Sequence, residues 1–267
     1  MPFVLLDKPR DAVTLVTLNR PERMNAMAFD VMVPLREALE AISIDNSTRV
    51  VVITGAGHGF CSGADLEDPG SVPNVDGLTL PTIALRSMEL LDDVILALRR
   101  MHQPVIAAVN GAAIGGGFCL SLAADIRIAS ETAYFRAAGI NNGLTAAELG
   151  ISYFLPRMVG QSRASEIMLT GRDVDSEEAE RIGLVSSVVS GDELLDVAYE
   201  TAERIIGWSR AGVELTKRAL KTSLDAGSLA SHIDHEGTAQ LFVRLTTQNF
   251  EEAIRARRDK RPPDFKD

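Results

Sequence analysis

Two glycine-rich segments are the first candidates for chemistry, because backbone N–H groups that carry no side chain in front of them can bind an anion. The first spans residues 55–66 (GAGHGFCSGADL) after an apolar run, and the second is Gly115-Gly116-Gly117 before a small-residue segment. At a helix N-terminus such N–H groups lack acceptors, and the helix dipole favours negative charge there. The glycine triplet therefore predicts either an anion site or close backbone packing, and by itself it favours neither.

Other chemistry that glycine-rich loops can support is not indicated. The spacing of Gly55, Gly57 and Gly59 misses the G-x-G-x-x-G pattern of dinucleotide-binding loops by one residue, and the residues that follow do not open a helix. The sequence also lacks the G-x-S-x-G pattern of α/β serine hydrolases. Neither a dinucleotide site nor a serine nucleophile is expected.

The cysteines and histidines do not form a metal-ligand pattern. Cys61 and Cys119 are far apart in the sequence, and His232 and His235 have no further ligands near them. We expect no metal and no disulfide framework. Cys119 could be a nucleophile, but no histidine lies near it in the sequence, so a small buried core residue is the preferred interpretation.

The charge balance argues against a nucleic-acid-binding surface. The 267 residues include 27 basic and 37 acidic ones, which gives a formal net charge of −10. A local exception is the basic segment 255–261, which is either a solvated helix end or a phosphate contact. No stretch of 18 apolar residues and no leader-like N-terminus is present, so we expect a cytoplasmic protein without membrane contacts.

Hydrophobic periodicity predicts the elements that position these residues. The predicted strands span residues 13–19, 50–54, 105–109, 126–129 and 184–189, and the predicted helices span residues 28–43, 85–101, 163–169 and 177–182. The prolines and glycines within residues 68–80 predict a surface loop, and the sequence pattern from residue 193 onward predicts helices. The order predicts an α/β core over residues 1–192 and a helical C-terminal module over residues 193–267.

Several motifs in one order resemble the enoyl-CoA hydratase/isomerase (crotonase) family. They are LNRPERMNAM, VVITGAGHGFCSGADL, PVIAAVNGAAIGGGFCLSLAADIRIAS, LPRMVGQSRASEIMLTGRDVDSEEAERIGLVSSVV and the final KRPPDF. The resemblance runs from Leu18 to Phe265. It implies a spiral of repeated ββα units, a C-terminal helical trimerisation module, and a homotrimer or a dimer of trimers.

The resemblance also implies that the ligand is an acyl-CoA thioester, with no metal or redox cofactor and with CoA arriving as part of the substrate. The N–H groups of Ala64 and Gly116 would form an oxyanion hole for the thioester carbonyl, which suits the negative charge of an enolate. Ser62, Asp65 and Leu66 would line the CoA site beside Ala64. Lys260 would bind CoA phosphates, which favours the phosphate interpretation of the basic segment.

The sequence departs from the family at the positions that do acid–base chemistry. The positions of the two usual catalytic glutamates match Cys119 and Gly139, and an apolar position before Lys260 matches Arg257. Glu148 matches the position of an acid–base aspartate in the dienoyl-CoA isomerase branch, although a solvated glutamate at a helix N-terminus is an equal alternative. We therefore expect an acyl-CoA-processing enzyme with impaired hydratase activity, or a non-catalytic acyl-CoA-binding protein as the alternative.

Overall fold

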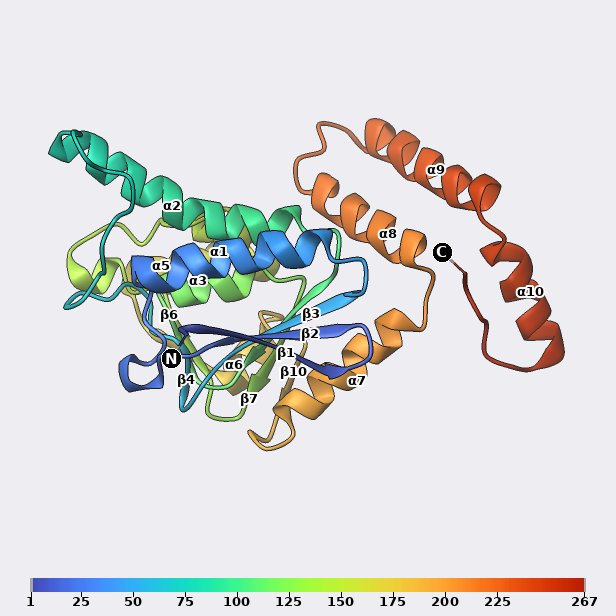
Figure 1. The fold of residues 1–267 in the computed structure, drawn as a ribbon, viewed down its shortest axis with the longest axis horizontal. Coiled ribbons are helices and arrows are strands. Elements are labelled where there is room, and N and C mark those ends of the chain that lie inside the picture. The colour runs from blue at the N-terminus through green and yellow to red at the C-terminus, as the bar shows by residue number, and fades with distance from the viewer. Residues whose placement is uncertain (1, 267) are drawn as a thin grey trace.

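The fold is built on two mixed β-sheets, which the computed structural model describes over residues 2–266 (Figure 1). The larger sheet has the strand order β1-β2-β3-β5-β7-β10 and the smaller one the order β4-β6-β8-β9. The larger sheet consists of β1 (Val4–Arg10), β2 (Val13–Leu18), β3 (Val50–Gly55), β5 (Val105–Val109), β7 (Ile126–Ser130) and β10 (Ser187–Val189). The smaller sheet consists of β4 (Gly59–Cys61), β6 (Ala112–Ile114), β8 (Tyr134–Arg136) and β9 (Asp173–Asp175).

The chain alternates between the two sheets in a repeating pattern. Strands β3, β5 and β7 are parallel neighbours in the larger sheet, and each is followed within a few residues by β4, β6 or β8. Strands β4, β6 and β8 are in turn parallel neighbours in the smaller sheet. A helix follows each pair, namely α2 (Leu80–Arg100), α3 (Gly116–Ala123) and α4 (Ile151–Val159). The predicted spiral of ββα units is confirmed.

The main core lies where α1 (Phe29–Ile44), α2 and α3 pack on the sheets. Strand β3 is buried at every position, as expected for a continuous apolar run in a parallel sheet. Helix α3 is buried at every residue, because it lies between the smaller sheet and the helices α2 and α4 and carries mainly apolar side chains. Helices α5 (Gln161–Thr170) and α6 (Ser176–Arg181) complete this part of the molecule.

The C-terminal helices differ in how they contact the core. Helix α7 (Leu194–Ile206) buries Leu194, Ala198, Tyr199 and Ala202 against the larger sheet. Helices α8 (Arg210–Ser223), α9 (Leu229–Thr246) and α10 (Asn249–Asp259) extend away from the core on one side of the molecule (Figure 1). The division into residues 1–192 and 193–267 stays a prediction, and the packing of α7 favours a module that starts after it.

None of the helices in the described part of the chain combines the length and the apolar character that a bilayer crossing requires.

Candidate active site

The carboxyl ends of three parallel strands bring the candidate residues together. Ala64 follows β4, Gly116 follows β6, and Glu148 follows β8 after a longer loop. Because parallel neighbours end at the same edge of a sheet, residues from three distant segments meet there. The N–H of Gly115 donates to the carbonyl of Arg136 at 2.8 Å, which joins the β6 end to the β8 end.

The N–H groups of Ala64 and Gly116 are free donors at this edge. Neither donates to an acceptor among the described residues, although the neighbouring Asp65 N–H donates to the carbonyl of Met27 at 3.2 Å. Gly116 is the first residue of α3, so its N–H has no partner within the helix. The two segments nearly touch, since a Cβ atom on Gly63 would lie 3.3 Å from the Gly116 nitrogen.

Glycine is required beside both donors. Gly63 has a φ of +81° and Gly115 a φ of +52°, which is the region that favours glycine. A Cβ atom on Gly63 would also lie 2.6 Å from the carbonyl oxygen of Ile114. Both interpretations of the glycine triplet, close backbone packing and an anion site, therefore remain compatible with the structure, because tight packing and N–H donors that are unpaired within the described residues occur in the same place.

The Glu148 carboxylate points at the glycine triplet and not into bulk solvent. Its Oε1 atom lies 3.3 Å from the position that a Cβ atom on Gly115 would occupy. The side chain is half-buried, and no hydrogen bond or ion pair to it occurs within residues 2–266. Burial raises the pKa of Glu148 above its ordinary value. A half-buried carboxylate without a partner is well placed to exchange protons with a ligand.

Cys119 lies beside Glu148 as a buried thiol. Its Sγ donates to the carbonyl oxygen of Glu148 at 3.5 Å, and the residue is fully buried in the core. Burial first, and the Glu148 carboxylate next, raise the pKa of the Cys119 thiol well above its usual value. The thiolate that a nucleophile needs is therefore disfavoured, in agreement with the expected core role.

Gly139 packs tightly below the loop that carries Glu148. A Cβ atom there would lie 2.1 Å from the carbonyl oxygen of Thr145, so no larger side chain fits without a shift of the loop. Neither Gly139 nor Cys119 supplies a carboxylate, and Glu148 is the acidic side chain that the structure brings to the glycine triplet.

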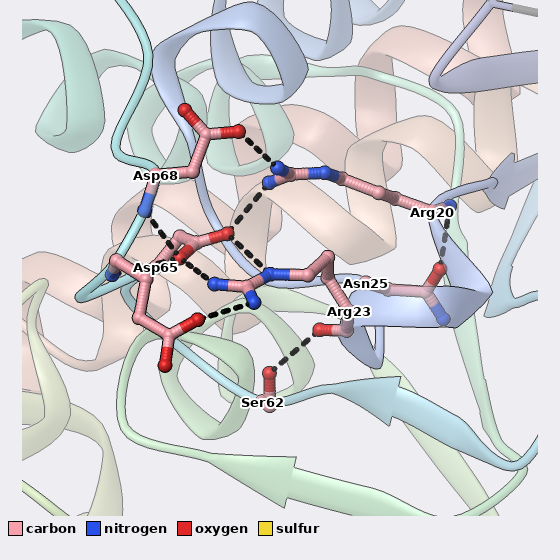
Figure 2. A network of polar contacts seen from close by, with 7 residues as sticks. Arg20, Arg23, Asn25, Ser62, Asp65 and Asp68 are labelled. Carbon is pink, nitrogen blue, oxygen red and sulfur yellow. Dashed lines mark hydrogen bonds and ion pairs between the residues drawn. The ribbon is translucent and has the colours of Figure 1, made fainter.

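Asp65 is held by two arginines (Figure 2). Its carboxylate accepts from the Arg20 guanidinium at 2.8 Å and from the Arg23 guanidinium at 2.6 Å, and it also accepts from the backbone N–H groups of Glu67 and Asp68. These hydrogen bonds, first of all those from Arg23, hold the pKa of Asp65 well below its usual range. The carboxylate therefore fixes the loop that carries Ala64.

Ser62 and Leu66 lie at the mouth of the site. Together with Ala64 and Arg23 they line a surface pocket of about 340 Å³. The Ser62 hydroxyl donates to the carbonyl of Arg23 at 3.3 Å, and Leu66 is 74% exposed. This pocket is where the predicted CoA moiety would enter.

Lys260 is not brought to this site within one chain. It ends α10, on the side of the molecule opposite the smaller sheet (Figure 1). Its role in CoA binding stays a prediction that requires a neighbouring copy of the chain.

Sequence reasoning missed several residues that shape the site. Met27 and Leu149 pack against Gly116, since a Cβ atom there would lie 2.2 Å from Met27 Sδ and 3.2 Å from Leu149 Cδ1. Arg20 and Arg23 fix Asp65 from 45 and 42 positions away. Arg20 and Arg23 could have been found from the sequence, because both lie inside the LNRPERMNAM motif.

No set of three or more His, Cys, Asp or Glu side chains arranged to hold a metal ion occurs within the described range.

Comparisons with known proteins all point to one family. A family model described as "Enoyl-CoA hydratase/isomerase" matches residues 8–267. A Mycobacterium tuberculosis protein named "Probable enoyl-CoA hydratase EchA12" is 68% identical over 265 residues, which are 99% of this chain and 93% of that protein.

Two solved structures extend the likeness to three dimensions. The crystal structure of a "probable enoyl-CoA hydratase/isomerase" from Mycobacterium abscessus is 67% identical, with a TM-score of 0.95 over 99% of this chain and 98% of that chain. The structure of a "monofunctional enoyl CoA isomerase" from M. smegmatis is 61% identical, with a TM-score of 0.75 over 87% of this chain and 99% of that chain. On the motifs, the fold and these matches together, the chain belongs to the enoyl-CoA hydratase/isomerase family.

Proposed function

We propose that this chain is an enoyl-CoA isomerase in which Glu148 moves one proton along the acyl chain. The observation that carries the proposal is the direction of the Glu148 carboxylate, which faces the free N–H groups beside Gly115 and has no partner of its own in the described chain. The M. smegmatis protein named an isomerase, at 61% identity, supports the same assignment.

The chemistry needs one carboxylate and two donors. Glu148 removes a proton from carbon 2 of a 3-enoyl-CoA, and the electron pair moves toward the thioester carbonyl to form a dienolate. The N–H groups of Ala64 and Gly116 stabilise the negative charge on that oxygen. The protonated Glu148 then returns the proton to carbon 4, which leaves the conjugated 2-enoyl-CoA with no gain or loss of atoms.

Hydration places different demands on the site. It requires a water molecule that is positioned and activated as well as a proton for carbon 2, and one carboxylate would have to serve both steps. We expect crotonyl-CoA hydration to be at least about 10²-fold slower than in a two-glutamate enzyme, because at least one positioned proton transfer is lost. Fast hydration would contradict the assignment of Cys119 and Gly139 to the glutamate positions.

The alternative, a non-catalytic acyl-CoA-binding protein, predicts a Glu148 that points into solvent. The observed orientation and the raised pKa of Glu148 favour the enzyme. A cytoplasmic location stays a prediction.

The decisive experiment compares wild type with Glu148→Gln, which keeps the shape of the side chain and removes the base. Conversion of a 3-enoyl-CoA to the 2-enoyl-CoA, followed by the absorbance of the conjugated product, should fall at least about 10²-fold in the variant. Glu177→Gln, at an exposed glutamate of α6, is the matched control and should behave as wild type.

A substrate deuterated at carbon 2 tests the shuttle itself. If Glu148 carries the same proton from carbon 2 to carbon 4, part of the deuterium should appear at carbon 4 of the product. Equal turnover by wild type and Glu148→Gln would remove Glu148 from the mechanism, and no turnover of any enoyl-CoA by wild type would favour the binding protein.

A further inference from the structure

A second pocket begins directly behind the candidate catalytic loop. It has a volume of about 490 Å³ and lies between α2, α4 and α8. Its apolar wall includes Ile95, Leu149, Phe154 and Leu224, and its charged wall includes Arg99 and Lys221. The pocket is therefore mainly apolar with a few polar groups, as small-molecule sites usually are.

Leu149 connects this pocket to the oxyanion donors. The residue lines the pocket, follows Glu148 in the sequence, and has its Cδ1 atom 3.2 Å from the position of a Cβ atom on Gly116. An acyl chain whose carbonyl lies at the Gly116 N–H would pass Glu148 with its first carbons. Its far end would then reach past Leu149 into the pocket between α2 and α8.

The pocket lining carries two cations, Arg99 and Lys221, and two carboxylates, Asp92 and Asp225. Arg99 is already close to a carboxylate outside the lining, that of Asp125. Asp125 pairs with Lys217 at 2.6 Å and lies 3.8 Å from the Arg99 guanidinium. Lys221 is one helical turn beyond Lys217 and donates to the carbonyl of Met101 at 3.2 Å. No carboxylate lies within ion-pairing distance of Lys221 in the part of the chain that the structure describes. Asp125 thus has Lys217 and Arg99 as ionic partners, and the Lys221 ammonium group stays without one among the described residues.

The two acidic side chains that line the pocket, Asp92 and Asp225, form no ion pair with Lys221. Asp225 accepts from the Tyr153 hydroxyl at 2.6 Å, and both Asp225 and Asp92 are exposed at the rim. Burial, and next the neighbouring Lys217, lower the pKa of Lys221 to about 8. Burial without a neighbouring anion disfavours the charged form of this ammonium group. An anionic ligand beside it would stabilise the charged form.

We infer that this pocket binds a carboxylate at the far end of the acyl chain, with Lys221 as its ionic partner and Arg99 beside it. The substrate class would be an enoyl-CoA whose chain ends in a carboxylate and not in a methyl group. The inference rests on the proposed function for the position of the thioester, and it adds a specificity-determining residue, Lys221, that makes no contact with the reacting carbons.

Binding measurements test this without any turnover. The probes are a saturated acyl-CoA that ends in a carboxylate and one of equal chain length that ends in a methyl group, titrated by calorimetry into wild type and Lys221→Met. We expect wild type to prefer the carboxylate ligand. Lys221→Met should weaken that ligand by about 10- to 100-fold, because a hydrogen-bonded ionic contact is lost, and should leave the methyl ligand within about threefold.

Two further variants control for structural damage. Lys221→Arg keeps the positive charge and should retain most of the preference, whereas Lys221→Met should lose it. Arg218→Met removes an exposed cation from the same helix outside the pocket and should bind both ligands as wild type does.

The outcomes separate this inference from the proposed function. Equal affinity of wild type for the two ligands, or an equal loss of both in Lys221→Met, would overturn the carboxylate pocket. A clear preference in binding combined with turnover that does not depend on Glu148 would keep the pocket and overturn the proposed isomerase mechanism.

Discussion

Glu148 has the burial that a catalytic base in this position needs, and its titration should be visible in the rate. Because burial raises its pKa, the base is protonated, and inactive, at pH values where an ordinary glutamate would already be ionised. We expect kcat/KM for 3-enoyl-CoA isomerisation to fall on acidification with a midpoint above about pH 4.3. A pH–rate profile measures this midpoint. If the residual activity of Glu148→Gln falls on acidification with the same midpoint, the titrating group is not Glu148.

Asp65 should contribute to the stability of the fold, which its position in the motif did not indicate. Its carboxylate and the guanidinium of its partner Arg20 form a buried ion pair, with side chains 1% and 8% exposed respectively. Asp65→Asn would leave the buried Arg20 guanidinium with only the exposed Asp68 carboxylate as its ionic partner, and it should lower the free energy of unfolding by about 3 kcal/mol. Urea denaturation at neutral pH measures the loss.

The matched control is Asp68→Asn, which removes an Arg20 partner that is 69% exposed and should cost about 1 kcal/mol or less. Since the pKa of Asp65 is depressed in the folded state, its contribution is present above about pH 3.9 and is lost as the pH falls further. Wild type should therefore lose more stability on acidification than Asp65→Asn, and equal losses would contradict the assigned role.

At the scale of elements, the N-terminus of α3 supplies a donor whose removal leaves the helix intact. Proline is tolerated in the first turn of a helix, so Gly116→Pro should preserve α3 and remove the Gly116 N–H. We expect isomerase kcat to fall by about 10²–10³-fold. Gly116→Ala retains the N–H and adds a Cβ atom against the flexible Met27 side chain, so it should lose clearly less activity than the proline variant. Equal losses would mean that packing at Gly116, and not its N–H, matters for the rate.

At the scale of the whole molecule, the C-terminal helices leave a large apolar surface uncovered. Helix α9 buries none of its residues, although it carries Leu229, Leu241, Phe242 and Leu245 with exposures between 55% and 77%. A helix that exposes several large apolar side chains is typical of a protein–protein contact. We predict a homotrimer or a dimer of trimers at micromolar concentration, measured by light scattering, and a monomer would contradict the prediction.

Assembly also bears on CoA binding. Helix α10, which Lys260 caps, lies on the opposite side of the molecule from β4, which precedes Ala64 (Figure 1). A contact of Lys260 with CoA phosphates would therefore have to come from a neighbouring copy. Leu241→Lys combined with Leu245→Lys should shift the protein to monomers through charge repulsion at the exposed face of α9. If Lys260 acts across subunits, these monomers should bind acyl-CoA as weakly as Lys260→Ala does, whereas unchanged affinity would remove Lys260 from the site.

The sequence by itself determined the family, the α/β spiral and the two glycine-rich segments whose N–H groups we propose as oxyanion donors. These features depend on local patterns. The patterns are the apolar runs of β3 and β5, and glycines at positions where the backbone has a positive φ or where another segment leaves no room for a Cβ atom. It did not indicate β1, the three-residue strand β6 or the helix α4. Strand β6 is too short for a periodic signal and is stabilised by its neighbours β4 and β8, and α4 contains Pro156, which argues against a helix when the sequence is read locally.

Only the tertiary structure decided where the charged side chains point and what they contact. The sequence left Glu148 open between a proton shuttle and a solvated side chain, and the meeting of the β6 and β8 ends turned its carboxylate toward Gly115. The place of Asp65 beside the CoA site stays a prediction, and the sequence did not indicate the two arginines more than 40 positions away that hold its carboxylate. It gave no sign of Lys221, which lines the pocket between α2, α4 and α8 because α8 packs beside the end of α2. The direction and burial of a charged side chain depend on contacts between distant segments, and local sequence patterns do not encode these contacts.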